Sequence, residues 1–165
     1  MKRLILLRHA KAEKEGPRGG GDAARPLAPR GVADAEALGR TLALAATRID
    51  AIVASPARRA LETARLVARE LDYPWDAIRI ERAAYLADPD TLLRIVQDGG
   101  EDARCLLLVG HNPGITGLAR ELARRFSEEL PTCGAVAIDC AVDTWGGVRP
   151  GCGSLRWYEP PASRR

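Results

Sequence analysis

The chain has 165 residues, of which 46% are apolar and 28% charged, and this balance is typical of a folded domain and excludes wholesale disorder. Its 25 basic and 22 acidic residues leave a net charge of +3, too small to indicate a nucleic-acid-binding protein. The apolar run after Met1 is too short for a signal peptide or a membrane span. We therefore expect a cytoplasmic monomer that binds neither nucleic acid nor membrane.

The N-terminal half alternates strands with helices. Residues 4–7 and 52–54 are short apolar runs, which is typical of strands buried on both faces of a sheet. A Gly-rich loop over 16–21 separates the first run from a helix that we expect to begin near Pro29. The apolar residues of this helix share one face, at Val32, Ala35, Leu38, Leu42 and Ala46. The apolar residues of the next helix also share one face, at Leu61, Ala64, Val67, Ala68 and Leu71.

The C-terminal half continues this alternation and then changes. We expect a short edge strand over 78–80, a helix over 88–97 and a buried strand over 106–109. The next helix has the clearest apolar stripe, at Ile115, Leu118, Ala119, Leu122, Ala123 and Phe126. Two further strands, over 135–141 and 155–158, are joined by a Gly-rich segment and predict an antiparallel edge.

These elements predict an α/β fold of three layers, in which helices cover both faces of a mostly parallel central sheet. No repeat or linker divides the chain, so we expect a single domain over 1–160 and a frayed tail over 161–165. The four cysteines contain no C-x-x-C pair, so we expect reduced thiols, no metal site and no cofactor.

Polar residues follow three of the buried runs at the point where each strand ends. Arg8-His9 follows the first run, Ser55-Pro56 the second, and residues 110–113 (GHNP) the third. Ligands of open parallel sheets bind beyond the carboxyl ends of the strands. Because all three junctions lie at that edge, we expect one site there, containing both histidines of the chain.

This edge is also expected to favour an anion. Ser55 and Asn112 each precede a proline, which is the pattern of a helix N-cap followed by the first helical residue. Helix N-termini offer free N–H groups and partial positive charge. Arg8 and one of Arg58 and Arg59 would add guanidinium groups that fit phosphate oxygens.

Three motifs in this order resemble those of the histidine phosphatase superfamily. Residues 7–10 (LRHA) resemble its R-H-G motif, with alanine in place of the usual glycine. Residues 55–63 (SPARRALET) resemble its S-P-x-x-R-A-x-Q-T segment, and residues 109–113 (VGHNP) its second-histidine motif. Arg25-Pro26-Leu27 and Gly31 resemble a segment of the short branch that contains the SixA-type phosphohistidine phosphatases. The resemblance covers nearly the whole chain and implies the phosphoglycerate mutase-like fold.

The resemblance also implies roles for particular residues. His9 matches the nucleophile that becomes transiently phosphorylated. Arg8 and Arg59 match the two phosphate-binding arginines, and His111 matches the second histidine, which contacts the phosphoryl group. These four are the catalytic candidates, and the last three are also substrate-binding candidates. Asn112 is a secondary candidate for substrate binding that we expect mainly to cap a helix.

The chemistry fits a metal-independent phosphatase acting on phosphorus through a neutral imidazole. Many members of the superfamily supply a carboxylate general acid, but the matching position here falls near Ala83 or Ala84, and we expect Glu81 and Arg58 to be surface charges. An alcohol leaving a phosphoester needs a proton, whereas imidazole leaving phosphohistidine needs less help. The favoured substrate is therefore phosphohistidine on a partner protein, which a shallow, open pocket would admit.

Other interpretations remain open at this point. The main alternative is a small-molecule phosphomonoesterase of the same superfamily, with Glu81 as the acid. A mutase would need a longer chain, and a catalytically silent phosphate-binding module would not need the intact set of four residues. A nucleic-acid-binding domain would need an aromatic platform or a concentrated basic stripe. The sequence does not name the physiological substrate.

Overall fold

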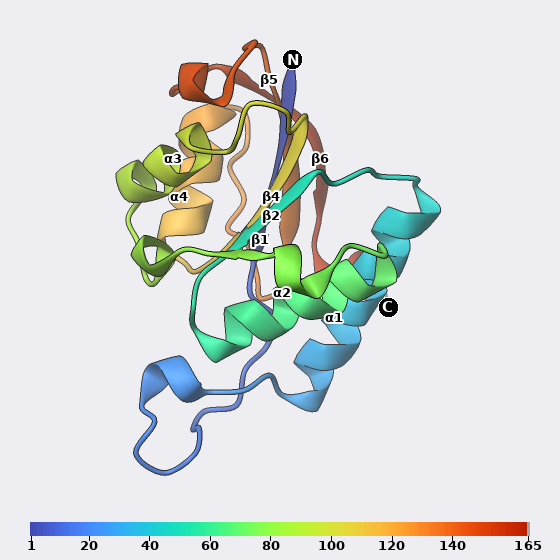
Figure 1. Ribbon diagram of the computed structural model, residues 1–165, viewed down its shortest axis with the longest axis vertical. Coiled ribbons are helices and arrows are strands. Elements are labelled where there is room, and N and C mark those ends of the chain that lie inside the picture. The colour runs from blue at the N-terminus through green and yellow to red at the C-terminus, as the bar shows by residue number, and fades with distance from the viewer. Residues whose placement is uncertain (165) are drawn as a thin grey trace.

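A six-stranded sheet forms the centre of the computed structural model, which describes residues 1–164. Its order is β3-β2-β4-β1-β5-β6 (Figure 1). The strands are β1 (Lys2–Arg8), β2 (Ala51–Ala54), β3 (Arg79–Ile80), β4 (Cys105–Gly110), β5 (Ala135–Cys140) and β6 (Gly153–Glu159). The first four are parallel, whereas β5 pairs antiparallel with β1 and β6 antiparallel with β5. The predicted parallel sheet with an antiparallel edge is confirmed.

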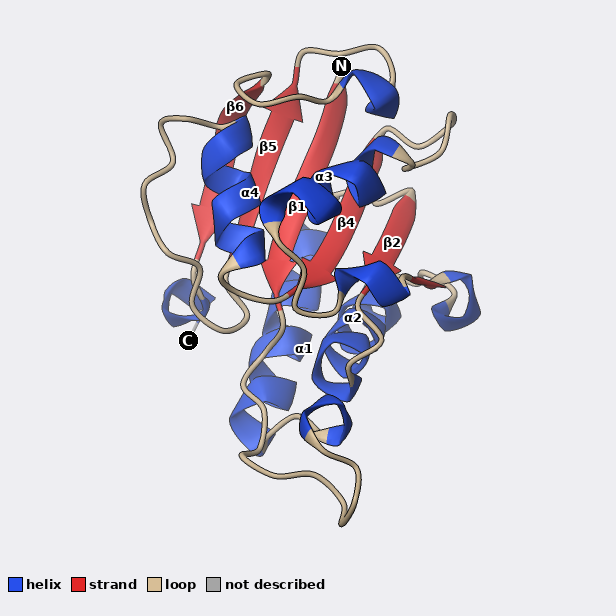
Figure 2. Ribbon diagram, turned by 90° about the vertical axis from the view of Figure 1, so that its left-hand side faces the viewer, coloured by secondary structure: helices blue, strands red, loops and turns tan. Residues whose placement is uncertain are grey.

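Four α-helices of the described residues cover the two faces of this sheet: α1 (Pro29–Leu44), α2 (Arg58–Glu70), α3 (Pro89–Gln97) and α4 (Gly114–Leu122). α1 and α2 pack on the face that carries Ile5 and Leu7, and α3 and α4 on the face that carries Leu4 and Leu6 (Figures 1 and 2). Successive side chains of a strand point to opposite faces, so β1 has to be apolar at every one of these positions. The three-layer fold is as predicted.

A long loop over residues 11–27 projects beyond the carboxyl ends of the strands (Figure 1). Its two ends are held together, because Ala12 and Leu27 form an antiparallel bridge and the Ala28 N–H donates to the Lys11 carbonyl at 2.9 Å. The Leu27 N–H also donates to Oε1 of Glu62, on α2, at 2.8 Å. The base of the 11–27 loop is thus fixed beside the first half of α2.

The predicted helix caps at Ser55 and Asn112 are wrong. α2 begins only at Arg58 and α4 only at Gly114, and the N-cap residue of neither helix makes a side-chain cap. Asn112 Oδ1 accepts from the Thr116 hydroxyl and not from a backbone N–H. Ser55 Oγ accepts from the Ala57 N–H, before α2 begins, and also bonds to a histidine ring.

The C-terminal segment ends in a 3-10 helix over Pro161–Arg164. This helix occupies most of the segment 161–165 that we expected to fray, and residue 165 lies outside the described residues. Pro161 is buried, and Ser163 Oγ donates to the Pro160 carbonyl at 2.8 Å. Within residues 1–164, no helix has the length and apolar character needed to cross a membrane.

Candidate functional site

The carboxyl ends of β1, β2 and β4 bring the predicted site residues together. The His9 N–H donates to the Gly110 carbonyl at 3.0 Å, and the Ser55 N–H donates to the Val109 carbonyl at 3.1 Å. His9, Ser55 and His111 therefore leave the sheet side by side. The rings of His9 and His111 lie with their centroids 5.2 Å apart. Convergence of the two histidines at this edge is what the sequence predicted.

Backbone contacts determine the tautomer of His9. Its Nδ1 lies 2.8 Å from the Ala10 carbonyl, which can only accept, so Nδ1 carries the proton. Nε2 of the neutral ring therefore keeps its lone pair, and Nε of Arg59 donates to it at 3.3 Å. The ring is buried, with 9% of its surface exposed. His9 thus presents an unprotonated nitrogen to a guanidinium group.

Ser55 and Arg59 determine the tautomer of His111. Nη2 of Arg59 lies 3.4 Å from Nδ1 of His111, and because a guanidinium can only donate, Nδ1 is the acceptor. Nε2 of His111 then carries the proton and donates to Ser55 Oγ at 2.7 Å. Ser55 Oγ also accepts from the Ala57 N–H at 3.2 Å. Ser55 therefore orients the second histidine.

Arg59 stands in the first turn of α2 and is 3% exposed. Thr63, one turn later, fixes this part of the helix to the nucleophile's strand. Its Oγ1 donates to the Arg59 carbonyl at 2.7 Å and accepts from the Ala10 N–H at 2.9 Å. The neighbouring Arg58 is exposed and pairs with Glu62 at 3.3 Å, as expected for a surface charge.

Arg8 is partly buried, and its position depends on a backbone carbonyl. Its Nη1 donates to the Leu130 carbonyl at 3.1 Å, while its buried Nε has no hydrogen-bond partner among the described residues. Asn112 Nδ2 donates to the same carbonyl at 2.9 Å, and Thr116 Oγ1 donates to Asn112 Oδ1 at 2.7 Å. Asn112 thus lies beside the site and supports the residue that holds Arg8.

Asp22, which was not among the predicted site residues, covers the outer side of Arg59. Nη1 of Arg59 donates to the Asp22 carbonyl at 2.9 Å, and Nη2 to Asp22 Oδ2 at 3.0 Å. The Tyr85 hydroxyl also donates to Oδ2, and Arg25 Nη1 donates to Oδ1 at 3.0 Å. The rings of Tyr85 and His111 in turn pack nearly perpendicular to each other, with centroids 5.6 Å apart. The one sequence signal for Asp22 is its place three residues before the Arg25-Pro26-Leu27 segment.

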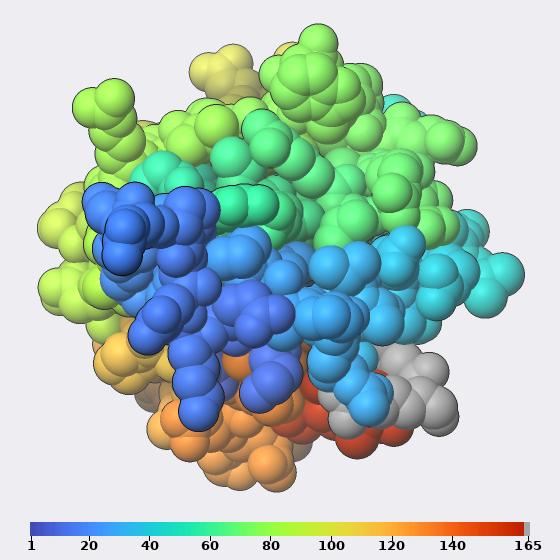
Figure 3. All heavy atoms as spheres, turned by 90° about the horizontal axis from the view of Figure 1, so that it is seen from below, coloured from blue at the N-terminus to red at the C-terminus, as the bar shows by residue number. Residues whose placement is uncertain are grey.

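The site is less open than we expected. His9 and His111 are both buried, and the 11–27 loop lies over this edge of the sheet. Figure 3 views the molecule from this end and shows the loop, in blue, between the green atoms around α2 and the orange atoms that follow α4. The buried rings differ from the shallow, open pocket that we expected, and Asp22, with 44% of its side-chain surface exposed, marks the rim of the site.

Burial keeps both histidines neutral. Loss of hydration lowers the pKa of His9 from 6.5 to about 4, assisted by the positive charges of Arg59 and Arg8. Burial likewise lowers the pKa of His111 to about 3, assisted by His9 and Arg59. Asp22 is shifted so that it stays ionised: hydrogen bonds from Tyr85 and Arg25 hold its pKa well below the usual value.

Glu81, the candidate acid, takes no part in this network. Its backbone N–H donates to the Ala54 carbonyl at 2.9 Å, and its side chain makes no hydrogen bond or ion pair with any described residue. Within the same part of the chain, no three His, Cys, Asp or Glu side chains gather closely enough to hold a metal ion.

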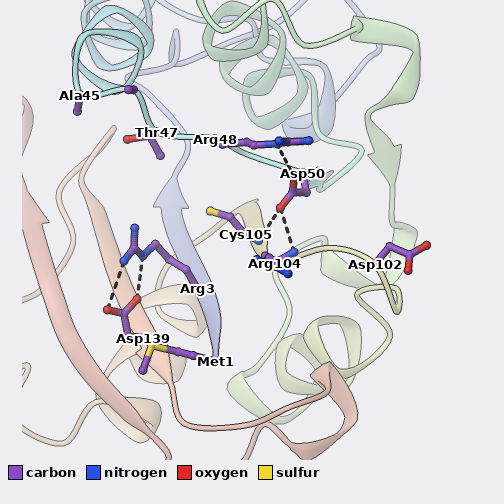
Figure 4. A pocket seen from close by; sticks show the side chains of 11 residues that line it. Met1, Arg3, Ala45, Thr47, Arg48, Asp50, Asp102, Arg104, Cys105 and Asp139 are labelled. Atoms are coloured by element: carbon purple, nitrogen blue, oxygen red, sulfur yellow. Dashed lines mark hydrogen bonds and ion pairs between the residues drawn. The ribbon is translucent and has the colours of Figure 1, made fainter.

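A pocket of about 540 Å³ lies at the opposite edge of the sheet, where β1 and β4 begin (Figure 4). Four of its charged side chains pair with one another, Arg3 with Asp139 at 2.8 Å and Arg48 with Asp50 at 3.2 Å. Ligands of parallel sheets bind at the carboxyl edge. The histidine cluster, and not this pocket, is therefore the candidate site.

Sequence comparisons agree with the motifs. The model of the histidine phosphatase superfamily (branch 1) matches residues 4–82, a segment that contains Arg8, His9 and Arg59. An uncharacterised protein of Mycobacterium tuberculosis (strain CDC 1551 / Oshkosh) is 34% identical over 165 residues, which cover 94% of this chain and 99% of that protein. An uncharacterised protein of Mycobacterium leprae (strain TN) is 32% identical over 148 residues, covering 82% and 88%.

Solved structures share the fold along the whole chain. The protein histidine phosphatase SixA complexed with tungstate has a TM-score of 0.84 at 19% identity, covering 99% of each chain. A candidate phosphohistidine phosphatase SixA from Agrobacterium tumefaciens has a TM-score of 0.76 at 26% identity, covering 97% of this chain and 99% of that one. A mycobacterial glucosyl-3-phosphoglycerate phosphatase complexed with VO3 has a TM-score of 0.70 at 17% identity, covering 97% and 100%.

Proposed function

The chain belongs to the histidine phosphatase superfamily, and from this premise we propose that it dephosphorylates phosphohistidine on a partner protein through a phosphorylated His9. One observation carries the proposal. The Ala10 carbonyl fixes the proton of His9 on Nδ1, so that a buried, neutral Nε2 faces the guanidinium of Arg59. That arrangement suits a nucleophile that attacks a phosphoryl group held by arginine.

The proposed reaction has two transfers. The Nε2 lone pair of His9 forms a bond to phosphorus while the bond from phosphorus to the leaving nitrogen breaks. Water then attacks phosphorus, and the electron pair of the His9–phosphorus bond returns to Nε2. Arg8, Arg59 and His111 would stabilise the phosphoryl oxygens in both steps, and we propose that these groups supply the charge that a metal ion provides in other phosphatases.

Two observations favour a nitrogen–phosphorus substrate over a phosphoester. The position that we match to the general acid of many superfamily members falls near Ala83 or Ala84, and the Glu81 side chain makes no hydrogen bond or ion pair with the described residues of the His9 network. Among similar structures, SixA is a protein histidine phosphatase, although another similar structure is a glucosyl-3-phosphoglycerate phosphatase. A small-molecule phosphoesterase using Glu81 is the alternative.

Steady-state turnover by the wild type, H9A and E81Q tests the proposal. The substrates are a protein phosphorylated on histidine, p-nitrophenyl phosphate and sugar phosphates. We expect the highest kcat/KM on the phosphohistidine protein, an acid-labile phosphate on His9 of the wild type, and no activity or labelling of H9A. Faster wild-type turnover of the small esters, with a large loss on them in E81Q, would establish the alternative.

A further inference from the structure

One guanidinium group joins the nucleophile to a carboxylate. Nε of Arg59 lies 3.3 Å from Nε2 of His9, and Nη2 of the same group lies 3.0 Å from Oδ2 of Asp22. In an in-line transfer, the leaving group departs from the side of phosphorus opposite the nucleophile. A phosphoryl group bound to Arg59 between His9 and Asp22 would have its leaving group on the Asp22 side.

Asp22 is held in place as a negative charge at the rim of a cationic site. Its carboxylate accepts from Arg59, Arg25 and Tyr85, and 44% of its side-chain surface is exposed. A carboxylate in this position attracts a cationic leaving group and repels an anionic one.

We propose that Asp22, positioned by Tyr85, binds the leaving group of the substrate and selects a protonated nitrogen heterocycle over an alcohol. The proposal rests on the function proposed above and specifies the substrate class: phosphoryl groups on a ring nitrogen whose second nitrogen carries a proton. Asp22 thereby determines specificity and is distinct from the four residues that surround the phosphoryl group.

The chemistry of the leaving ring explains why a carboxylate would help. When the second nitrogen carries a proton, the electron pair of the breaking phosphorus–nitrogen bond leaves on a neutral imidazole that keeps this proton. Without the proton, the ring would leave as an imidazolate anion, which is a much poorer leaving group. Asp22 would accept a hydrogen bond from the protonated nitrogen and so favour the reactive form.

His9 itself shows the same arrangement. Once phosphorylated on Nε2, it must leave phosphorus as a neutral imidazole when water attacks. Its Nδ1–H donates to the Ala10 carbonyl at 2.8 Å, which keeps that nitrogen protonated throughout. The Ala10 carbonyl thus serves the enzyme's own phosphohistidine as Asp22 would serve the substrate's.

The experiment compares D22N with the wild type on two substrates, a phosphohistidine protein and p-nitrophenyl phosphate. Asparagine keeps the shape of the side chain but removes its charge. We expect kcat/KM on the phosphohistidine protein to fall at least about 10-fold, the range of a charged hydrogen bond, while kcat/KM on the ester stays within about 3-fold. Two further variants test the charge and the position of Asp22. D22E, which keeps the charge, should retain most of the preference for the phosphohistidine protein over the ester, and Y85F should lose part of that preference. D90N, an exposed position on α3, is the matched control.

An equal loss on both substrates would overturn the proposal, because Asp22 would then serve only to hold Arg59. Thermal unfolding of D22N and D22E separates such a loss from misfolding. Failure of the proposed function looks different: the wild type would turn over neither substrate and would carry no acid-labile phosphate on His9. An active wild type whose substrate preference is unchanged in D22N overturns the role of Asp22 alone.

Discussion

Nε of Arg59 lies 3.3 Å from Nε2 of His9, so a buried cation directly faces the proposed nucleophilic lone pair. Arg59 lies in the first turn of α2, and His9 directly follows β1. Thr63 joins these two places, because its hydroxyl donates to the Arg59 carbonyl and accepts from the Ala10 N–H. The cation disfavours protonation of the ring and offers N–H groups to an incoming phosphoryl group.

Replacing Arg59 with alanine should therefore reduce kcat/KM by about 100-fold or more, the typical effect of losing one donor that stabilises a transition state. The chain provides a matched control in Arg58, the same residue type at the adjacent position but exposed and paired with Glu62. R58A should keep kcat/KM within about 2-fold of the wild type. Similar losses in the two variants, measured on one substrate, would contradict the assignment of Arg59.

Ser55 is expected to act through His111. S55A removes the acceptor that lies 2.7 Å from Nε2 of His111, so the ring loses one of the two contacts that orient it, while Arg59 still donates to Nδ1. We expect kcat to fall about 10-fold with little change in KM, because the effect concerns orientation. Nitrogen-15 NMR of S55A should still show the Nε2–H tautomer of His111, with an Nε2–H signal that is shifted from its wild-type position. A His111 signal that stays at its wild-type position, as in the S154A control on β6, would argue against this role.

The parts of the site that the sequence predicted are those carried by strand ends. Continuous apolar runs indicated β1 and β4, and the residue after each run had to lie at the carboxyl edge of the sheet. His9 and His111 therefore came together in the prediction from local pattern alone. The motif resemblance then distinguished Arg59 from Arg58, which periodicity could not do.

The parts that the sequence did not predict depend on long-range contacts. Asp22 lies in a Gly-rich loop without periodicity, and its partners Arg59 and Tyr85 are 37 and 63 positions away in the chain. The cap predictions for Ser55 and Asn112 failed for a different reason. Local propensity favours a cap at both positions, but Asn112 Oδ1 accepts from Thr116 Oγ1 and not from a backbone N–H. Ser55 Oγ accepts from the Ala57 N–H and the His111 ring, and α2 begins only after Ala57.

The two buried histidines should make stability depend on pH. Their pKa values in the folded chain are about 4 for His9 and about 3 for His111, against 6.5 for an unperturbed ring. As pH falls below 6.5, the unfolded state binds protons that the folded state refuses, so the free energy of unfolding falls until the folded pKa is reached. Between pH 7 and pH 5 we expect a loss of about 2 kcal/mol for each histidine.

Urea unfolding of the wild type and H111N at several pH values measures this loss. H111N should lose about 2 kcal/mol less than the wild type between pH 7 and pH 5, because it lacks one of the two rings. The carboxylates titrate in both proteins and cancel in this difference. Parallel stability curves for the two proteins would mean that His111 is protonated as easily in the folded state as in the unfolded state.

Gly31 is expected to be essential for the position of the segment that follows the nucleophile. A Cβ at residue 31, in the first turn of α1, would lie 2.1 Å from the Lys11 carbonyl oxygen, so the backbone after Ala10 would have to move. G31A should lower the free energy of unfolding by roughly 2 kcal/mol, which is about 4–8 °C in Tm for a chain of this size, and should reduce phosphatase activity as well.

The opposite outcome for G31A is a gain in stability. Alanine stabilises a helix by about 1 kcal/mol relative to glycine, so without the clash G31A would be more stable than the wild type. G146A, where no atom comes closer than 3.9 Å, should leave both properties near wild type. The sign of the change in Tm of G31A therefore decides whether α1 packs this closely against the backbone of Lys11, two residues after His9.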